Sequence, residues 1–246
     1  MFRSFFLLLI LSLLGFSLPT QKPITIYMAG DSTMSIKTKE DHPERGWGMM
    51  LPVFFNDKVT IDNRAQNGRS TKTFRSEGLW QGILDTIQAG DYVIIQFGHN
   101  DSSPEKVGRY TTPDEYKANL IRFVKESSAK KAKPILCTPI MRRRFDEEGK
   151  FYDTHGIYPD LVREVAKNMK IPLVDMHRKS EQLLIAYQEE GSKKLFLHIN
   201  PGEYVSLPDG LEDNTHFSAF GAQQMAGLFV EGITELKLKL RRYFKN

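Results

Sequence analysis

The feature that most constrains the fold is an alternation of short apolar segments with longer segments of helical spacing. The short segments are rich in β-branched and aromatic residues and are bounded by polar residues, Gly or Pro, which predicts buried strands at 24–28, 59–62, 92–97, 134–139 and 171–176. Between them, apolar residues recur at helical intervals, as at Leu79, Ile83 and Ile87. This alternation predicts a three-layer α/β/α sandwich with a mostly parallel sheet.

Two further helices have recognisable starts. Thr112 followed by Pro113 is a suitable beginning for a helix that carries Tyr116 and Leu120 on its apolar face. Ser218 is a suitable N-cap for a last helix, which we expect from about Ala219 to Tyr243. No repeat, low-complexity tract or linker interrupts the chain, so we expect a single domain over residues 18–246.

The N-terminus has the pattern of a secretory signal peptide. One positive charge, Arg3, precedes an apolar run of 12 residues from Phe5 to Phe16, which is too short to span a bilayer comfortably. Gly15 and Ser17 are small residues at the −3 and −1 positions of a cleavage after residue 17. We therefore predict a leader over residues 1–17, a secreted or periplasmic protein and no stable membrane insertion after cleavage. The alternative is an uncleaved N-terminal anchor.

Composition and charge exclude several classes of protein. Hydrophobic residues make up 40% of the chain and charged residues 26%, which is typical of globular proteins. The net charge is only +4, and Arg142–Arg144 is the one compact basic run, so we expect no nucleic-acid partner. The only cysteine, Cys137, lies in an apolar run and is interpreted as a buried strand residue.

Polar and glycine residues follow three of the predicted strands, where parallel sheets bind their ligands. The first strand leads into Gly30-Asp31-Ser32, and Ser32 is a candidate nucleophile. A serine nucleophile needs a histidine base that is oriented by a carboxylate. Asp213 and His216 lie three residues apart just before the last helix, in what we expect to be a loop, and they can supply both groups.

Donors for an oxyanion are also present after the strands. Gly68 can offer a backbone N–H, Asn100 its side-chain amide, and Ser32 its own N–H at the start of a helix. Taken singly, each of these features has a structural alternative as a turn, a helix cap or a surface pair. Together and in this order, they indicate one catalytic site at the strand ends.

Four segments carry a resemblance to a known family. "AGDSTM" (29–34), "NGRST" (67–71), "FGHND" (97–101) and "DNTHFS" (213–218) resemble the signature blocks of the GDSL or SGNH hydrolases. The segments 46–48, 138–145 and 208–222 also look like the rhamnogalacturonan acetylesterase branch. The resemblance implies a flavodoxin-like five-stranded parallel sheet of order 2-1-3-4-5. It further implies removal of acetyl groups from pectic polysaccharide by a Ser-His-Asp acyl-enzyme mechanism without metal or organic cofactor.

The sequence allows more than one interpretation of the substrate-binding residues and of the substrate. The basic run could pair with galacturonate carboxylates or form a solvated loop; it consists of Arg142, Arg143 and Arg144. Trp47 could stack on a sugar ring or lie in the core. The expected partner is an acetylated polysaccharide or oligosaccharide; the sequence does not identify the polymer, the acetylated position or the oligomeric state. The alternatives are an acetyl xylan esterase, a broad short-chain carbohydrate esterase, a metal-dependent phosphoesterase and a non-catalytic carbohydrate-binding protein.

Overall fold

A five-stranded parallel sheet forms the centre of the protein. The computed structural model describes residues 21–245, so the predicted leader lies outside the described residues. The strands are β1 (Ile24–Gly30), β2 (Val59–Asn63), β3 (Tyr92–Gln96), β4 (Lys133–Cys137) and β5 (Leu173–Val174). They are hydrogen-bonded in the order β2-β1-β3-β4-β5. This order confirms the expected topology, with the carboxyl ends of all five strands at one edge.

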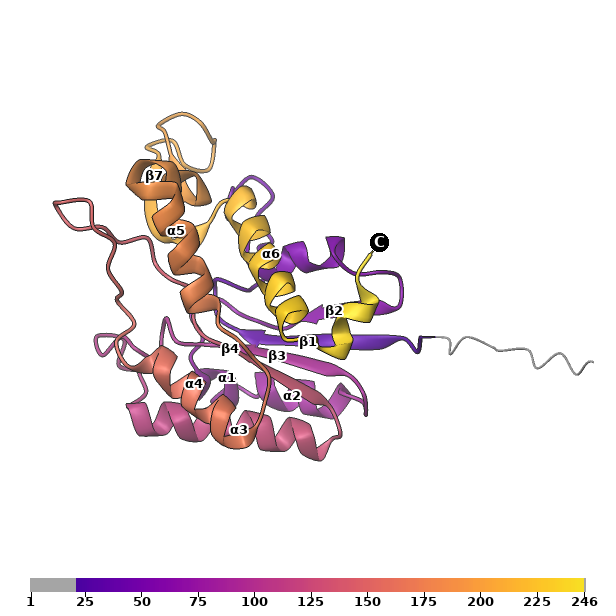
Figure 1. Ribbon diagram of the computed structural model, residues 1–246. Helices are drawn as coiled ribbons and strands as arrows, with labels where there is room; N and C mark the ends of the chain where they lie inside the picture. Colours follow the sequence, from indigo (N-terminus) through magenta and orange to yellow (C-terminus); the bar gives the residue numbers. More distant parts are fainter. Residues whose placement is uncertain (1–20, 246) are drawn as a thin grey trace, which may run out of the picture.

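Helices cover both faces of this sheet, which confirms the three-layer sandwich (Figure 1). One face carries α1 (Thr71–Ser76), α2 (Leu79–Thr86), α3 (Pro113–Ala129) and α4 (Tyr158–Met169), packed around one apolar core cluster. The other face carries α5 (Met176–Ser192), α6 (Ala219–Glu235) and three 3₁₀ helices at Trp47–Val53, Lys193–Leu195 and Lys239–Tyr243. The inner strands β1, β3 and β4 are therefore largely shielded from water on both sides, as their apolar sequences require.

Local sequence explains where the helices begin. The Thr112 side chain accepts from the backbone N–H of Glu115, and the Glu115 side chain accepts from the N–H of Thr112, so α3 starts with a capping box before Pro113. The Ser218 hydroxyl accepts from the N–H of Gly221 at the start of α6. Both predicted helix starts are thus confirmed.

The prediction for the last helix is wrong at its end. α6 stops at Glu235, and Lys237 takes a left-handed backbone conformation with φ of 51°. The N–H of Leu238 then donates to the carbonyl of Ile233, and the N–H of Lys237 to that of Thr234, which is the geometry of a Schellman C-cap. The apolar residues beyond this point belong to the separate 3₁₀ helix at Lys239–Tyr243. The end of α6 could not be recognised from the sequence, because a lysine takes the left-handed position that glycine usually occupies.

The segment that carries Asp213 and His216 is a strand and not the expected loop. β7 (Leu211–Phe217) pairs antiparallel with β6 (Phe196–Ile199), and the register shifts between Phe196 and Leu197. This two-stranded sheet lies beyond the end of α5 (Figure 1). Polar residues fill most of β7, so its sequence lacks the apolar alternation that identifies a strand.

Cys137 ends β4 and is buried, which confirms its interpretation as a strand residue. Burial raises the pKa of its thiol, and this keeps the residue unreactive. Within residues 21–245, no helix combines the length and the apolarity needed to cross a membrane.

Candidate active site

Three side chains from two distant parts of the sequence form a continuous hydrogen-bonded chain. The Nε2 atom of His216 lies 2.9 Å from the Ser32 hydroxyl oxygen. On the other side of the ring, Nδ1 lies 2.7 Å from Oδ2 of Asp213. Ser32 directly follows β1, whereas the other two residues come from β7. The arrangement is that of a serine nucleophile, a general base and an orienting carboxylate.

The Asp213 carboxylate is fixed by three hydrogen bonds with residues of its own strand. Its Oδ1 atom accepts from the backbone N–H of Thr215 at 2.7 Å and of His216 at 3.0 Å, which leaves Oδ2 for the imidazole. Partial burial disfavours its charge, but the hydrogen bonds from His216 lower the pKa of Asp213 to about 2. Burial also opposes the charged form of His216, yet Asp213 raises the pKa of that ring above its ordinary value. The base is thus held in one orientation and made more basic.

Ser32 is presented by a tight turn that only small residues permit. A Cβ atom on Gly30 would lie 2.7 Å from the sulfur of Met34 and 3.0 Å from the carbonyl of Gln96. The carbonyl of Asp31 accepts from the N–H of Met34 and of Ser35, and its buried carboxylate accepts from the N–H of Thr33. Burial raises the pKa of Asp31. These contacts hold the turn after β1 and place Ser32 at the wall of a cavity.

The predicted oxyanion donors meet Ser32 at that cavity. It has a volume of about 390 Å³ and is lined by Ser32, Glu44, Asn67, Gly68, His99, Asn100, Lys106, Arg109, Arg142, Thr215 and His216. Gly68 has a φ of +76°, in the region that favours glycine. The Asn100 amide nitrogen lies 3.0 Å from the carbonyl of Arg69 and donates to it. Asn100 is therefore anchored to the segment that carries Gly68.

A buried carboxyl group that we did not single out from the sequence joins these two segments. Asp101 Oδ1 accepts from the hydroxyls of Thr71 at 2.6 Å and Thr111 at 2.9 Å, and from the backbone N–H of Thr71. Burial raises the pKa of Asp101 to about 7 despite these hydrogen bonds. Because Asp101 follows Asn100 and Thr71 begins α1, this network fixes the distance between the two oxyanion segments.

The predicted substrate contacts are only partly supported. Arg142 lines the cavity, where its guanidinium donates to the backbone carbonyl of His99. Arg143 is 5% exposed and donates to the carbonyl of Glu189, so its predicted contact with substrate is wrong. Trp47 is fully buried, and its indole N–H donates to Gln96 at 2.6 Å, so the predicted stacking on sugar is wrong too. Arg144 is partly buried and does not belong to the cavity lining.

Other cavity residues were missed because nothing near them in the sequence marks them. Lys106 and Arg109 lie in the loop between β3 and α3, where isolated basic residues are typical of any surface. A side chain at position 68 would meet the Arg109 guanidinium at 2.9 Å, so this group packs directly against Gly68. The Lys106 ammonium lies 3.4 Å from the side-chain oxygen of Asn100. The cavity wall is thus strongly basic near the oxyanion donors.

Comparison with known proteins agrees with this geometry. The model of the GDSL-like Lipase/Acylhydrolase family matches residues 28–224. The chain belongs to this family. It is 42% identical to the rhamnogalacturonan acetylesterase RhgT of Bacillus subtilis, over 90% of this chain and 94% of that protein. It is 37% identical to the probable rhamnogalacturonan acetylesterase YesY of the same organism, over 87% and 94% of the two chains. The family resemblance predicted from the four blocks is confirmed.

Solved structures show the same fold. The crystal structure of YxiM from Bacillus subtilis superposes with a TM-score of 0.76 at 26% identity, covering 89% of this chain and 58% of that one. Axe2 from Geobacillus stearothermophilus, an acetylxylan esterase, superposes with a TM-score of 0.63 at 17% identity, over 88% and 96% of the two chains. At this identity the second similarity shows the fold alone. The sequence and fold together make this protein a carboxylic ester hydrolase of the GDSL type.

Proposed function

We propose that this protein is a serine esterase that removes acetyl groups from rhamnogalacturonan. The observation that carries the proposal is the hydrogen-bonded chain from Ser32 through His216 to Asp213, which opens on a cavity with Gly68 and Asn100. The acetylesterase relatives, similar over nearly their whole length, support the reaction and the polymer.

The reaction has two halves that use the same groups. The Ser32 oxygen attacks the acetyl carbonyl while Nε2 of His216 takes its proton, and Asp213 stabilises the imidazolium. The backbone N–H groups of Ser32 and Gly68 and the amide of Asn100 bind the oxyanion. When the tetrahedral intermediate collapses, the carbon–oxygen bond to the sugar breaks and His216 returns the proton to the departing hydroxyl. Water then attacks the acetyl-serine in the same way, and this releases acetate and restores Ser32.

The charge of the cavity favours an acidic polymer over a neutral one. Lys106, Arg109 and Arg142 contribute three cationic groups to its wall, and Glu44 is its only carboxylate among the described residues. Guanidinium groups bind carboxylates through paired charge-assisted hydrogen bonds. The alternating galacturonate units of rhamnogalacturonan would supply such carboxylates, whereas the backbone of xylan is neutral. The basic wall therefore favours the pectic substrate over acetylated xylan.

The decisive comparison is acetate release from acetylated rhamnogalacturonan, acetylated xylan and a long-chain ester under identical conditions. We expect the highest kcat/KM with rhamnogalacturonan. A preference for xylan would retain the esterase mechanism and overturn the substrate. Acetate release from none of the three would overturn the proposed function itself.

The Asn100→Ala variant tests the oxyanion site. Loss of one oxyanion donor is expected to lower kcat by about 10²–10³-fold with a smaller change in KM, because the amide binds charge that develops only in the transition state. Steady-state acetate release measures this effect. Asn168→Ala, on an exposed position of α4, is the matched control and should retain full activity. Nearly unchanged turnover of Asn100→Ala would remove Asn100 from the mechanism.

The Arg109→Gln variant tests recognition of the acidic polymer. Loss of one charge-assisted hydrogen bond to a carboxylate is expected to lower kcat/KM for acetylated rhamnogalacturonan by about 10–100-fold. Arg109→Lys should retain part of this activity, and hydrolysis of the uncharged ester p-nitrophenyl acetate should change little in either variant. Arg122→Gln is a control on an exposed arginine of α3. An equal loss with both esters would show that Arg109 acts on the catalytic groups instead.

We further propose that the protein is secreted, so that it meets a cell-wall polymer outside the cell. The leader predicted over residues 1–17 supports export to the periplasm or the medium. Mass spectrometry of the protein recovered from an expressing culture should find a mature chain that begins at or shortly after residue 18. An intact N-terminus would favour the anchor instead.

A further inference from the structure

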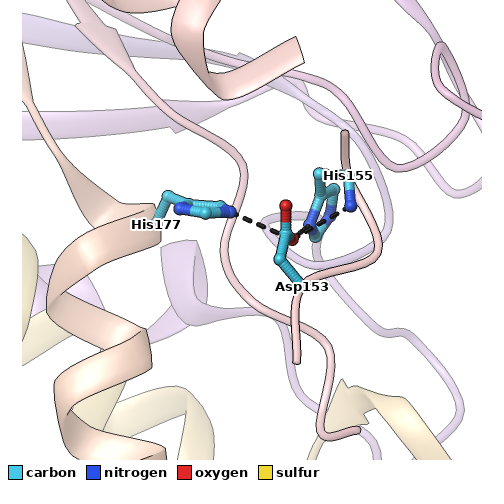
Figure 2. Close-up of side chains that lie close together, drawn as sticks. All are labelled: Asp153, His155 and His177. Carbon is cyan, nitrogen blue, oxygen red and sulfur yellow. Dashed lines mark hydrogen bonds and ion pairs between the residues drawn. The ribbon is translucent and has the colours of Figure 1, made fainter. Parts of the chain in front are cut away.

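A compact group of two histidines and one aspartate lies beside the catalytic cavity and has no part in the proposed reaction. Asp153, His155 and His177 each offer one ligand atom, and these three atoms lie within 4.8 Å of one another. The three side chains point toward one another (Figure 2). Nδ1 of His155 is 3.0 Å from Oδ1 of Asp153, and Nε2 of His177 is 3.1 Å from the same oxygen.

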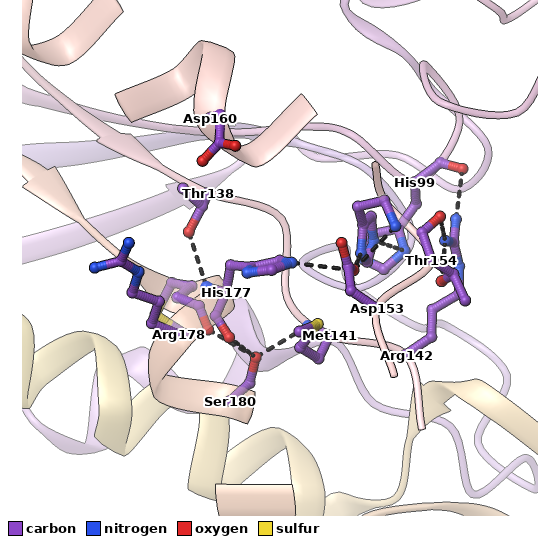
Figure 3. A network of polar contacts seen from close by, with 12 residues as sticks. His99, Thr138, Met141, Arg142, Asp153, Thr154, Asp160, His177, Arg178 and Ser180 are labelled. Carbon is purple, nitrogen blue, oxygen red and sulfur yellow. Dashed lines mark hydrogen bonds and ion pairs between the residues drawn. The ribbon is translucent and has the colours of Figure 1, made fainter. Parts of the chain in front are cut away.

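The three residues are held in place by two different parts of the fold. Asp153 and His155 belong to the segment between β4 and α4, and the backbone N–H of His155 donates to Asp153 at 2.9 Å. His177 lies in the first turn of α5, where its N–H donates to the hydroxyl of Thr138 at 2.8 Å. A polar network extends from these residues to His99 on one side, through His155, and to Ser180 on the other, through His177 (Figure 3). The group is therefore preorganised.

One atom of this group lacks a proper partner. His177 is only 8% exposed, and its buried Nε2 atom faces Oδ1 of Asp153 at 3.1 Å without a regular hydrogen bond. A cation between His177 and Asp153 would provide the missing interaction. The side chain of Asp153 is 30% exposed, which leaves room for water ligands and a path of entry.

We propose that Asp153, His155 and His177 bind a divalent transition-metal ion such as Zn²⁺. Around a tetrahedral Zn²⁺, bonds of about 2.0–2.2 Å to nitrogen and oxygen separate two ligand atoms by about 3.3–3.6 Å. The observed separations of 3.0 and 3.1 Å from Asp153 Oδ1 are slightly shorter, so a small rotation of the Asp153 side chain would admit the ion. Two imidazoles and one carboxylate suit Zn²⁺, Mn²⁺, Co²⁺ or Ni²⁺, whereas Ca²⁺ and Mg²⁺ prefer a full set of oxygen ligands.

The surrounding charges are compatible with a cation. Arg142 donates to the hydroxyl of Thr154, between Asp153 and His155, and Arg163 lies with Nη2 3.4 Å from Nδ1 of His177. Its guanidinium is already paired with Asp175 at 2.9 Å and Asp160 at 2.6 Å, so its charge is largely balanced. When Nε2 of His177 binds the ion, the ring proton lies on Nδ1. Nδ1 can then no longer accept from Arg163, so this weak contact is lost.

An ion at this position would also act on the catalytic cavity through His99. Nε2 of His155 lies 3.4 Å from Nδ1 of His99, a residue of the cavity wall. Without an ion, His155 donates from Nδ1 to Asp153, so its Nε2 accepts from His99. With an ion on Nδ1, the His155 proton lies on Nε2 and the direction of this contact reverses. His99 then carries its own proton on Nε2 instead of Nδ1.

Direct binding to the full protein tests the proposal and does not depend on esterase activity. Chelator-treated and dialysed protein is titrated with Zn²⁺ by calorimetry, and with Co²⁺ by visible absorption. We expect one ion per chain, and a melting temperature that rises by about 5–10 °C when free Zn²⁺ is about 100 times Kd. Ca²⁺ should have no comparable effect. The ¹⁵N shifts of His99 should report the change of tautomer.

Variants locate the site. His177→Ala and Asp153→Asn are each expected to weaken Zn²⁺ binding at least about tenfold, as is usual for loss of one ligand or of its partner. His42→Ala removes a histidine outside the group and should bind like the wild type. Two variants are needed because one alone could fail to fold, which circular dichroism detects. Absence of stoichiometric binding, or equal binding by the wild type and both folded variants, overturns the proposal.

Discussion

The Ser32→Ala variant is expected to lose at least about 10⁴-fold in kcat for acetate release. The hydroxyl is the group that forms the acyl-enzyme, and no other hydroxyl of the described chain is bonded to His216. The remaining activity should reflect only the oxyanion donors and substrate binding. Acetate release from acetylated rhamnogalacturonan measures the loss. Substrate binding should persist, because alanine removes only one atom from the cavity wall.

The control for this variant is Ser76→Ala, at an exposed position at the end of α1. It should behave like the wild type. If Ser32→Ala retained turnover within tenfold of the wild type, the acyl-enzyme mechanism would be wrong. The oxyanion donors would then have to serve a direct attack by water.

The Asp213→Asn variant is expected to lower kcat by about 10⁴-fold, even though the asparagine side chain has almost the same shape. The aspartate accepts from Nδ1 of His216 and so leaves Nε2 free to take the serine proton. An asparagine amide can turn its NH₂ group toward Nδ1 and thereby hold the ring in the wrong tautomer. Asp209→Asn, on an exposed residue of the preceding loop, should retain activity.

The same pair predicts the pH dependence. Burial opposes the charge on His216, but Asp213 raises the pKa of the ring above its ordinary value. Since the base acts in its neutral form, kcat/KM should fall as the pH drops through this raised pKa. In Asp213→Asn the stabilising charge is absent, so the acid limb of the remaining activity should move to lower pH. If the acid limb stayed at the same pH in Asp213→Asn, it would have to report the titration of a group other than His216.

The sequence alone determined the layers and the strand ends. Strands buried on both faces must be continuously apolar, and the helices that cover them must be amphipathic, so both patterns can be recognised locally. Ser32, Gly68 and Asn100 follow strands of one parallel sheet, so the fold class alone places them at one edge. This is why the residues that the structure brings together there were identified before their distances were known.

The tertiary structure decided which polar and aromatic residues face the cavity. Arg142 and Arg143 are neighbours in the sequence, yet one lines the cavity and the other is buried against Glu189 and Ser192. Trp47 lies in a 3₁₀ helix, and its polar N–H donates to Gln96 at the end of β3, so its burial could not be predicted from its neighbours. Burial of such groups depends on partners far along the chain, and local sequence does not encode those partners.

The group of Asp153, His155 and His177 illustrates the same limit. Its first two members are separated from the third by all of α4 and β5. Packing of α5 against the end of β4 brings His177 to the other two, through a hydrogen bond to Thr138. Local chemistry determines strands, caps and turns, because neighbouring residues make those contacts. Convergence of distant side chains is decided only when the whole chain packs.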